Sequence, residues 1–344
     1  MIQKTFPILI LLILISVLVL SLFLDDDEPQ RIEGSIMGTT YNVIVFSEYD
    51  NLEQSIYDSF NSVNLSMSTY LNDSLINKVN YSDINEWVEV SQDFIKVLRY
   101  AVDTCNKSKG LYDVSIGKLV DSWGFGSLEK NQKPPPKDIQ YLKTQVGCDS
   151  IEINKEASAV KRKRDVALDF SSIAKGFAID KVYKHLSSEL NIDNLFVELG
   201  GEIRTTKHKI GKTPWKIGVV SPSKPDKIVH SFISSNHDSF AMATSGDYRN
   251  IRIFNEEEYS HTINPIVGSP NNLSRKSVSV ISDNAMIADA LATTLNVMEL
   301  EAAMDYANEY EIKALFIYEQ DGKPNLLFSK ELQKVKMKRC LKLS

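Results

Sequence analysis

Apolar residues along the chain follow two repeating patterns, one typical of helices and the other typical of strands. Helical spacing predicts helices at Leu52–Leu65, Asp93–Asn106 and Asn284–Met298. Short alternating or continuous apolar runs predict strands at Thr40–Phe46 and Ser277–Ile281. The helices and strands interleave without a regular strand–helix–strand repeat. We therefore expect an α+β fold with mixed or antiparallel sheets and flanking helices.

The stretch Ala167–Lys181 is central to this pattern. It starts as a predicted buried strand, Val166–Phe170, and passes through Ser171 and Ser172 into an amphipathic helix. Serines before an apolar-periodic run are a helix N-cap signal, and the unpaired N–H groups of a helix start suit a phosphate. Gly176 lowers helix propensity in the first turn, which indicates that something approaches the backbone closely there.

The first residues form a segment of their own. The apolar run Ile8–Leu24 has the length of a short membrane span and exceeds a usual signal-peptide core. Lys4 precedes the run and the acidic cluster Asp25–Glu28 follows it, so the rest of the chain is predicted to lie outside the cytoplasm. We expect residues 1–28 to be a signal or anchor, with an uncleaved anchor preferred. The expected location is the periplasmic or outer side of a bacterial inner membrane.

The remaining chain is interpreted as one folded domain with short flanks. Residues 29–36 are predicted to be a linker, residues 37–330 the domain, and residues 331–344 a basic, solvated tail. The basic cluster Lys161–Arg164 is interpreted in the same way, as a solvated turn, because charge runs usually are.

Composition and charge limit the classes of molecule that the chain is expected to bind. The chain has 344 residues and a formal net charge of -6, which does not favour a nucleic-acid partner and repels anionic substrates at long range. Cys105, Cys148 and Cys340 are widely spaced and form no metal motif. One bridge could form in an oxidising compartment, but unpaired, mostly buried thiols are the preferred interpretation. No cysteine lies near the apolar run, which excludes a lipid-anchored amino terminus.

Two oxygen-bearing side chains on the last long predicted helix could bind a metal ion. Asp289 and Thr293 are four residues apart and therefore share a helix face. A carboxylate and a hydroxyl suit a hard cation such as Mg²⁺, and neighbouring alanines leave room for a close approach. Without further support, an Asp and a Thr on a solvated face would be the better interpretation.

His261 is the histidine with the most suggestive surroundings, in a Ser-His-Thr-Ile-Asn-Pro segment between a strand and a glycine-containing loop. A histidine there could act as a base near neutral pH, although a single loop histidine is more often polar surface. Tyr70 and the Trp123–Gly126 segment could stack on a planar ring, but aromatic residues are core residues first.

Together, these signals form an ordered series that resembles the ApbE family of FAD:protein FMN transferases. The resemblance extends over roughly residues 34–318 and rests on Met37–Tyr41, Ser68–Tyr70, Asp113–Gly117, Trp123–Gly126, Asp169–Gly176, Gly200–Glu202, Thr244–Tyr248, His261–Pro265 and Ala288–Thr293. It implies an ApbE-like, T-fold-like architecture for the domain.

The resemblance also implies a reaction. Such enzymes cleave FAD, attach FMN through a phosphoester to a threonine or serine of a target protein, and release AMP with the help of Mg²⁺. The target is expected to be a subunit of a membrane redox complex. Phosphoryl transfer depends mainly on positioning and charge neutralisation.

The resemblance assigns roles to individual residues. Asp289, Thr293 and the Ala174 carbonyl would bind Mg²⁺. His261 would activate the acceptor hydroxyl or stabilise the transferred phosphate. The residues expected to lie against FAD are Met37, Tyr70, Asp113 and Lys175.

The sequence departs from the family pattern at two minor positions. Many members have Thr at the position of Ser115 and Glu at the position of Leu75. Two other functions stay open: hydrolysis of FAD to FMN and AMP, and flavin binding without catalysis outside the cytoplasm. An aromatic residue at the position of Tyr70 goes with transferase members, and simple binding needs no metal pair.

Overall fold

The computed structural model describes residues 29–335, apart from 47–48, 128–132, 225, 238–239, 248–250, 255, 271–275 and 321–322. The predicted anchor, residues 1–28, lies outside the described residues, as do Cys340 and most of the predicted tail. Within the described part of the chain, no helix is long and apolar enough to cross a membrane.

An eight-stranded sheet in which every pairing is antiparallel forms the centre of the fold, which confirms the predicted α+β class. Its strands, in spatial order, are β1 (Gln30–Ile36), β2 (Thr39–Val45), β6 (Leu195–Leu199), β7 (Glu202–Thr205), β10 (Phe240–Gly246), β15 (Ser277–Ser282), β16 (Lys313–Gln320) and β17 (Lys323–Phe328). Residues 30–36 are therefore an edge strand, and the prediction of a linker at 29–36 is wrong. The hairpin with β2 satisfies their backbone groups.

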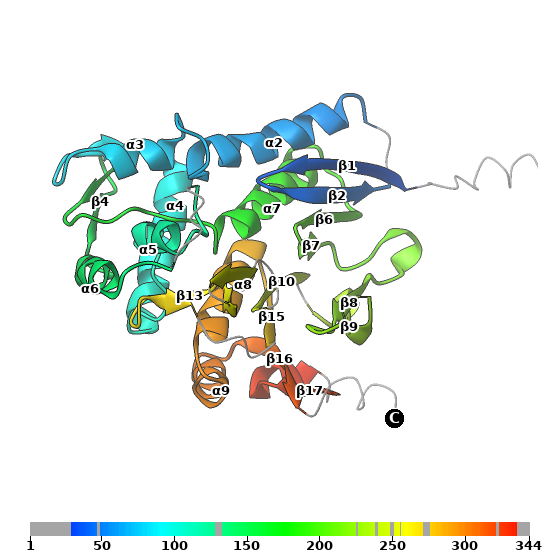
Figure 1. Ribbon diagram of the computed structural model, residues 1–344. Coiled ribbons are helices and arrows are strands. Elements are labelled where there is room, and N and C mark those ends of the chain that lie inside the picture. The colour runs from blue at the N-terminus through cyan, green and yellow to red at the C-terminus, as the bar shows by residue number, and fades with distance from the viewer. Residues whose placement is uncertain are drawn as a thin grey trace, which may run out of the picture.

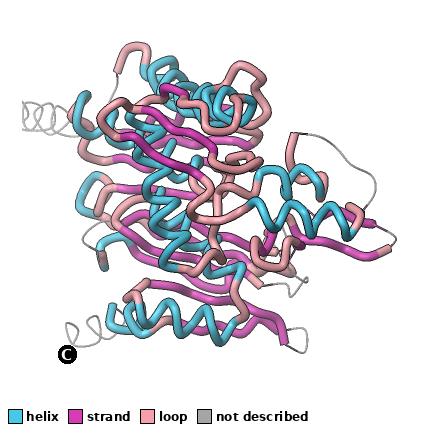
Figure 2. The backbone as a smooth tube through the Cα atoms, turned by 90° about the vertical axis from the view of Figure 1, so that its left-hand side faces the viewer, coloured by secondary structure: helices cyan, strands magenta, loops and turns pink. Residues whose placement is uncertain are grey.

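The two faces of the sheet pack against different partners. Strand β6 shows why: Leu195 and Val197 point to one face and are fully buried, whereas Phe196 points to the other. The first face is covered by α7 (Ala174–Lys184) and α8 (Ala285–Val297), which lie side by side in Figure 1. In Figure 2 this side is turned to the viewer, and helices lie in front of the strands.

The opposite face packs against a two-stranded ribbon, β8 (Lys216–Val220) and β9 (Ile228–Ile233). The remaining helices are α2 (Leu52–Met67), α3 (Leu75–Tyr81), α4 (Gln92–Lys107), α5 (Gly117–Ser122), α6 (Pro136–Gln145) and α9 (Leu300–Glu309). The smaller strands are β3 (Val88–Glu89), β4 (Ile151–Asn154), β5 (Ala159–Arg162), β11 (Ile251–Phe254), β12 (Glu257–Ser260), β13 (Ile263–Asn264) and β14 (Ser269–Pro270). The predicted helices thus correspond to α2, α4 and α8.

The segment before α7 differs from the prediction. Residues 166–170 are buried except for the partly exposed Ala167, and they form a single bridge, between Ile116 and Ala167, instead of a strand in a sheet. The serines do not cap the helix, because α7 begins at Ala174 and its N-cap residue is Ile173, which makes no side-chain cap hydrogen bond. Ser172 instead donates a hydrogen bond to Tyr112. Long-range contacts therefore prevail over the local capping pattern.

A disulfide joins Cys105 to Cys148, so the preferred interpretation of unpaired thiols is wrong for these two residues. Cys105 lies near the end of α4, and folding brings its Cα to 5.6 Å from that of Cys148 after α6. This separation is within the range that a disulfide spans. The pair is 43 residues apart in sequence, so only the tertiary structure could reveal it.

Two basic segments are less exposed than predicted. Arg162 is 4% exposed, and its guanidinium donates hydrogen bonds to the carbonyls of Val166 and Ser82, so it is not part of a solvated turn. In the predicted tail, residues 330–335 form a helical turn, and Leu332 is buried in the core beside the β8–β9 ribbon. For Arg162, hydrogen bonds to backbone carbonyls outweigh the preference of its charge for water. For the tail, burial of Leu332 outweighs the preference of the basic residues around it for water.

Candidate active site

The first turn of α7 lies directly against α8. A Cβ atom at Gly176 would meet the carbonyl oxygen of Ala285 and would lie 2.8 Å from the Cβ of Asp289. The Gly176 N–H donates a hydrogen bond of 3.0 Å to Oδ2 of Asp289. The partner expected to approach Gly176 closely is thus α8, and glycine is required because a side chain would separate the two helices.

Asp289 is buried at this contact, with 5% of its surface exposed. Burial raises the pKa of its carboxyl to about 6, the ammonium of Lys175 opposes the shift, and the negative charge of Glu202 adds to it. The raised pKa means that the positive charge of Lys175 and the hydrogen bond from Gly176 do not fully offset the cost of burying the charged carboxylate. A bound cation would offset the rest of this cost.

The start of α8 is fixed by Asp180, a residue that was not predicted to belong to the site. The Asp180 carboxylate accepts hydrogen bonds of 2.9 Å from the N–H groups of both Ala285 and Met286. Arg204 donates a 2.7 Å hydrogen bond to the same carboxylate. Because Asp180 lies on α7, it locks the two helices together one turn after Gly176. Its only sequence signal is a polar residue on a mostly buried helix.

Lys175 connects the helix pair to the sheet. Its Nζ lies 2.7 Å from Oε1 of Glu202, the first residue of β7, and 3.9 Å from Oδ1 of Asp289. Glu202 is 4% exposed. Glu202 belongs to the Gly200–Glu202 motif, to which the family resemblance assigns no role. The sequence feature that could have singled out Glu202 is its position after two glycines at the start of a buried strand.

The residues predicted to hold a metal ion come from the two helices of this contact. Asp289 and Thr293 are one turn apart on α8, and Ala174 is the first residue of α7, two residues before Gly176. Within the described residues, no group of three or more His, Cys, Asp or Glu side chains could hold a metal. The predicted set is different, because it contains one carboxylate, one hydroxyl and one backbone carbonyl. These hard oxygen donors fit Mg²⁺, which commonly takes its other ligands from water and phosphate.

Asp113 lies in a buried loop that contacts the central stretch. Its Oδ1 accepts a 2.8 Å hydrogen bond from the N–H of Ser115, whose Oγ accepts one from the N–H of Gly147. Burial raises the pKa of Asp113, and hydrogen bonds from the same loop oppose this shift. The neighbouring Tyr112 accepts a 3.1 Å hydrogen bond from Ser172, just before α7. Asp113 is therefore placed by the segment that leads to Ala174.

Met37 occupies the turn of the β1–β2 hairpin. Met37 and Gly38 both have positive φ angles, 52° and 73°, as a two-residue hairpin turn of this twist requires. Next to this turn, a Cβ atom at Gly200 would lie 3.0 Å from the side chain of Thr39 and 3.4 Å from Oε2 of Glu202. The turn of Met37 is therefore adjacent to the Glu202–Lys175 pair.

Tyr70 lies at the other end of the site and is 65% exposed. Its hydroxyl donates a 3.2 Å hydrogen bond to the carbonyl of Phe125. Trp123, close by in the same segment as Phe125, is buried and donates a 2.9 Å hydrogen bond to the carbonyl of Gly268. Trp123 is thus a core residue, whereas Tyr70 presents a free aromatic face.

His261 lies between β12 and β13 and is half-buried. Its neighbour Thr262 accepts a 3.3 Å hydrogen bond from the amide of Asn296, which also donates one of 2.8 Å to Asp247. Asn296 belongs to α8, one turn after Thr293. Helix α8 therefore carries two of the predicted metal ligands, Asp289 and Thr293, and also anchors the segment that contains His261.

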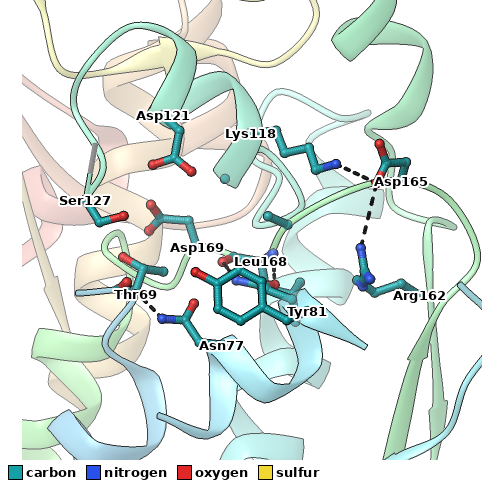
Figure 3. Close-up of a pocket in the computed structure, with 13 residues that line it drawn as sticks. Thr69, Asn77, Tyr81, Lys118, Asp121, Ser127, Arg162, Asp165, Leu168 and Asp169 are labelled. Carbon is teal, nitrogen blue, oxygen red and sulfur yellow. Dashed lines mark hydrogen bonds and ion pairs between the residues drawn. The ribbon is translucent and has the colours of Figure 1, made fainter. Parts of the chain in front are cut away.

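A cavity of about 290 Å³ lies next to the Tyr70 loop and to residues 167–169, which precede α7. Figure 3 shows Thr69, Asn77, Asp121 and Asp169 around one part of it, and the Lys118–Asp165 ion pair with its neighbour Arg162 at another. The lining includes Thr69, next to Tyr70, and Asp169, whose carboxylate accepts a hydrogen bond from the N–H of Ser171. None of the predicted site residues is among those that line the cavity.

A sequence profile described as the ApbE family matches residues 37–316. The chain belongs to the ApbE family. The matched residues extend from the hairpin turn at Met37 beyond Thr293, so they include every residue predicted for the site.

Relatives and solved structures of the ApbE family agree with this assignment. The chain is 34% identical over 303 residues to the FAD:protein FMN transferase of Haemophilus influenzae, covering 85% of this chain and 87% of that protein. It is 33% identical to the FAD:protein FMN transferase of Vibrio cholerae, covering 86% and 89%. The structure of the flavin transferase ApbE from Vibrio cholerae superposes with a TM-score of 0.77 at 30% identity, covering 89% of this chain and 99% of that one.

An ApbE structure from Thermotoga maritima superposes with a TM-score of 0.79 at 26% identity, covering 90% of this chain and 99% of that one. The ApbE-like architecture expected from the sequence is therefore confirmed for the described part of the chain.

Proposed function

We propose that this chain is a Mg²⁺-dependent FAD:protein FMN transferase that attaches FMN to a threonine or serine hydroxyl of a target protein and releases AMP. Relatives that match most of the chain at 33–34% identity carry the name of this activity. The named relatives support the transferase class, and the arrangement of this chain's own residues supports the details.

The buried Asp289 at the first turn of α7 is the observation on which the proposal depends most. A carboxylate that is fixed by a backbone N–H and that has a raised pKa is poised to take a cation. The same turn of α7 offers the positive end of a helix to a phosphate group. A dinucleotide pyrophosphate with a bound divalent cation is the class of ligand that satisfies both features.

The proposed transfer forms one bond and breaks one. The oxygen of the acceptor hydroxyl forms a bond to the phosphorus of the FMN phosphate, and the bond from this phosphorus to the bridging oxygen breaks. AMP leaves with that oxygen and its electron pair, and a ring nitrogen of His261 takes the hydroxyl proton. Bound Mg²⁺ would neutralise negative charge on the pyrophosphate. Lys175 orients the phosphates, and Met37, Tyr70 and Asp113 hold the rest of FAD.

We also propose a location for this activity. Residues 1–28 anchor the chain in a bacterial inner membrane, and residues 29–344 face the periplasm or the cell exterior. The apolar run Ile8–Leu24, preceded by Lys4 and followed by acids, supports this orientation. The acceptor is then a protein accessible from that side, such as a subunit of a membrane redox complex. A carboxy-terminal reporter that is active only in the cytoplasm should stay silent, and a signal from it would overturn the orientation.

The deciding experiment incubates the purified full-length chain with FAD and Mg²⁺, with and without candidate redox subunits. Transfer predicts AMP release that depends on the acceptor, together with FMN covalently attached to a threonine or serine. AMP release at the same rate without an acceptor would instead indicate FAD hydrolysis. Binding of FAD without AMP release under either condition would contradict an enzymatic role.

A further inference from the structure

The ammonium of Lys175 lies between two buried carboxylates that come from different elements. Glu202 is on β7 and Asp289 on α8, and both are at most 5% exposed. The two distances are unequal, because Nζ of Lys175 lies 2.7 Å from Glu202 but 3.9 Å from Asp289. Glu202 therefore makes the direct ion pair, and Asp289 faces the ammonium across a wider gap.

The position of Glu202 in the fold keeps the Lys175 ammonium next to the Glu202 carboxylate. Glu202 follows Gly200 and Gly201, whose φ angles of 64° and 99° form the turn between β6 and β7. Its Oε2 is buried and has no hydrogen-bond partner among the described residues. A buried carboxylate with one cationic partner is costly, so its presence calls for a reason other than stability.

The Lys175 side chain could reach Asp289 if Glu202 did not hold it. Direct ammonium–carboxylate pairs have distances of about 2.7–2.9 Å, so the ammonium would need to approach Asp289 by about 1 Å. The flexible four-carbon stem of lysine allows such a movement. A direct pair would occupy Asp289 Oδ1 with a fixed positive charge and would compete with any metal ion for this carboxylate.

We propose that Glu202 is a positioning residue that holds the Lys175 ammonium away from Asp289 and so keeps the Asp289 carboxylate available to a divalent cation. This inference rests on the metal site of the proposed function. It concerns a residue that touches neither the metal nor the reacting phosphate and that acts through Lys175.

The test measures Mn²⁺ binding to the purified full-length chain by electron paramagnetic resonance, in the absence of FAD and acceptor. Mn²⁺ serves as a probe because it prefers oxygen ligands, as Mg²⁺ does. Glu202→Gln keeps the shape and removes the charge, and it should weaken Mn²⁺ binding about 10- to 100-fold, as changes behind metal ligands do. The matched control is Glu198→Gln on β6, where the amide oxygen can still accept the hydrogen bond from Gly201 and binding should stay at the wild-type value.

The same measurement in a Lys175→Met background separates the positioning role of Glu202 from the simple loss of its negative charge. In a Lys175→Met chain no ammonium competes for Asp289, so adding Glu202→Gln should change Mn²⁺ affinity by less than about threefold. Equal weakening in both backgrounds, or no weakening in either, would overturn the inference. High Mg²⁺ should also restore AMP release by Glu202→Gln, which a folding defect would not allow; absence of this rescue contradicts the proposal.

The outcomes for the wild type keep the two proposals apart. Wild-type Mn²⁺ binding together with an unchanged Glu202→Gln variant overturns the role of Glu202 and leaves the transferase proposal intact. A wild-type chain that binds no Mn²⁺ overturns the metal site itself and, with it, this inference. Wild-type Mn²⁺ binding without AMP release in the assay with FAD and acceptor would count against the transferase alone.

Discussion

The two ends of the site are built differently. At the α7–α8 contact, Gly176, Asp180, Asp289 and Glu202 are on regular elements and are linked by direct hydrogen bonds or ion pairs. At the other end, Tyr70 is in a loop and is 65% exposed. Buried polar groups with fixed partners define one geometry, whereas exposed loops adapt to what binds. We therefore expect the α7–α8 contact to be formed before any ligand binds and the Tyr70 loop to adjust to its ligand.

Removing the charge of Asp289 should have the largest effect at the preformed end. Asp289→Asn should reduce AMP release to the rate without metal, because Asp289 is the only charged residue in the predicted ligand set. Thr293→Val keeps the shape but removes a neutral ligand, so it should only raise the Mg²⁺ concentration required. The measurement is AMP release against Mg²⁺ concentration, with circular dichroism as the folding control. Wild-type Mg²⁺ dependence in folded Asp289→Asn would contradict the metal assignment.

His261→Ala, in the segment between β12 and β13, should affect FMN transfer without affecting the binding of metal or FAD. We expect FAD and Mn²⁺ affinities near the wild-type values and a loss of FMN transfer of about 10²–10⁴-fold, typical for removal of a general base. Mass spectrometry of the acceptor gives the transfer rate, and fluorescence titration gives FAD binding. An unchanged transfer rate would make His261 an ordinary polar residue between β12 and β13.

Gly176→Ala should disturb the close approach of α7 and α8. Alanine favours an isolated helix by about 1 kcal/mol, but the added Cβ would meet the Ala285 carbonyl and Asp289. Overpacking of this kind typically costs about 1–3 kcal/mol, and we expect it to outweigh the gain because one neighbour is backbone. Urea unfolding should therefore show a less stable variant, with weaker Mn²⁺ binding. A variant at least as stable as the wild type would show that the helices can separate freely.

The raised pKa of Asp289 predicts the sign of a pH effect on the metal-free protein. The folded chain keeps a proton on Asp289 up to about pH 6, above the ordinary value of 3.8, so this group destabilises the fold as pH rises through that window. Between pH 5 and pH 7.5, wild type should lose about 1–2 kcal/mol of unfolding free energy relative to Asp289→Asn. Urea unfolding with a chelator at both pH values measures this difference. An opposite sign would mean that the carboxylate is well compensated without metal.

Tyr70→Phe should produce the smallest change, because it removes one hydrogen bond of an exposed side chain and keeps the ring. A net loss of at most about 1 kcal/mol is expected, which is less than about tenfold in FAD affinity. Tyr70→Ala removes the ring as well and should weaken FAD binding further. Fluorescence titration of both variants measures this, and equal affinities for them would show that the ring makes no contact with FAD.

The sequence by itself determined the features that depend on local periodicity. The apolar spacing predicted α2, α4 and α8, and the four-residue separation of Asp289 and Thr293 placed them on one helix face. The order of short motifs identified the family, because each motif is a short run of neighbouring residues that can be read without the fold. The need for glycine at position 176 was also predicted, although the neighbour that requires it was not.

The tertiary structure decided everything that depends on segments far apart in the chain. Lys175 and Glu202 are 27 residues apart and Gly176 and Asp289 are 113 apart, yet they form direct contacts. The disulfide between Cys105 and Cys148 likewise follows from packing that no local pattern records. A buried ion pair has no periodicity, since its partners are selected by the low-dielectric surroundings that folding creates. The motifs could therefore be recognised from the sequence, whereas the charge balance around Asp289 required the fold.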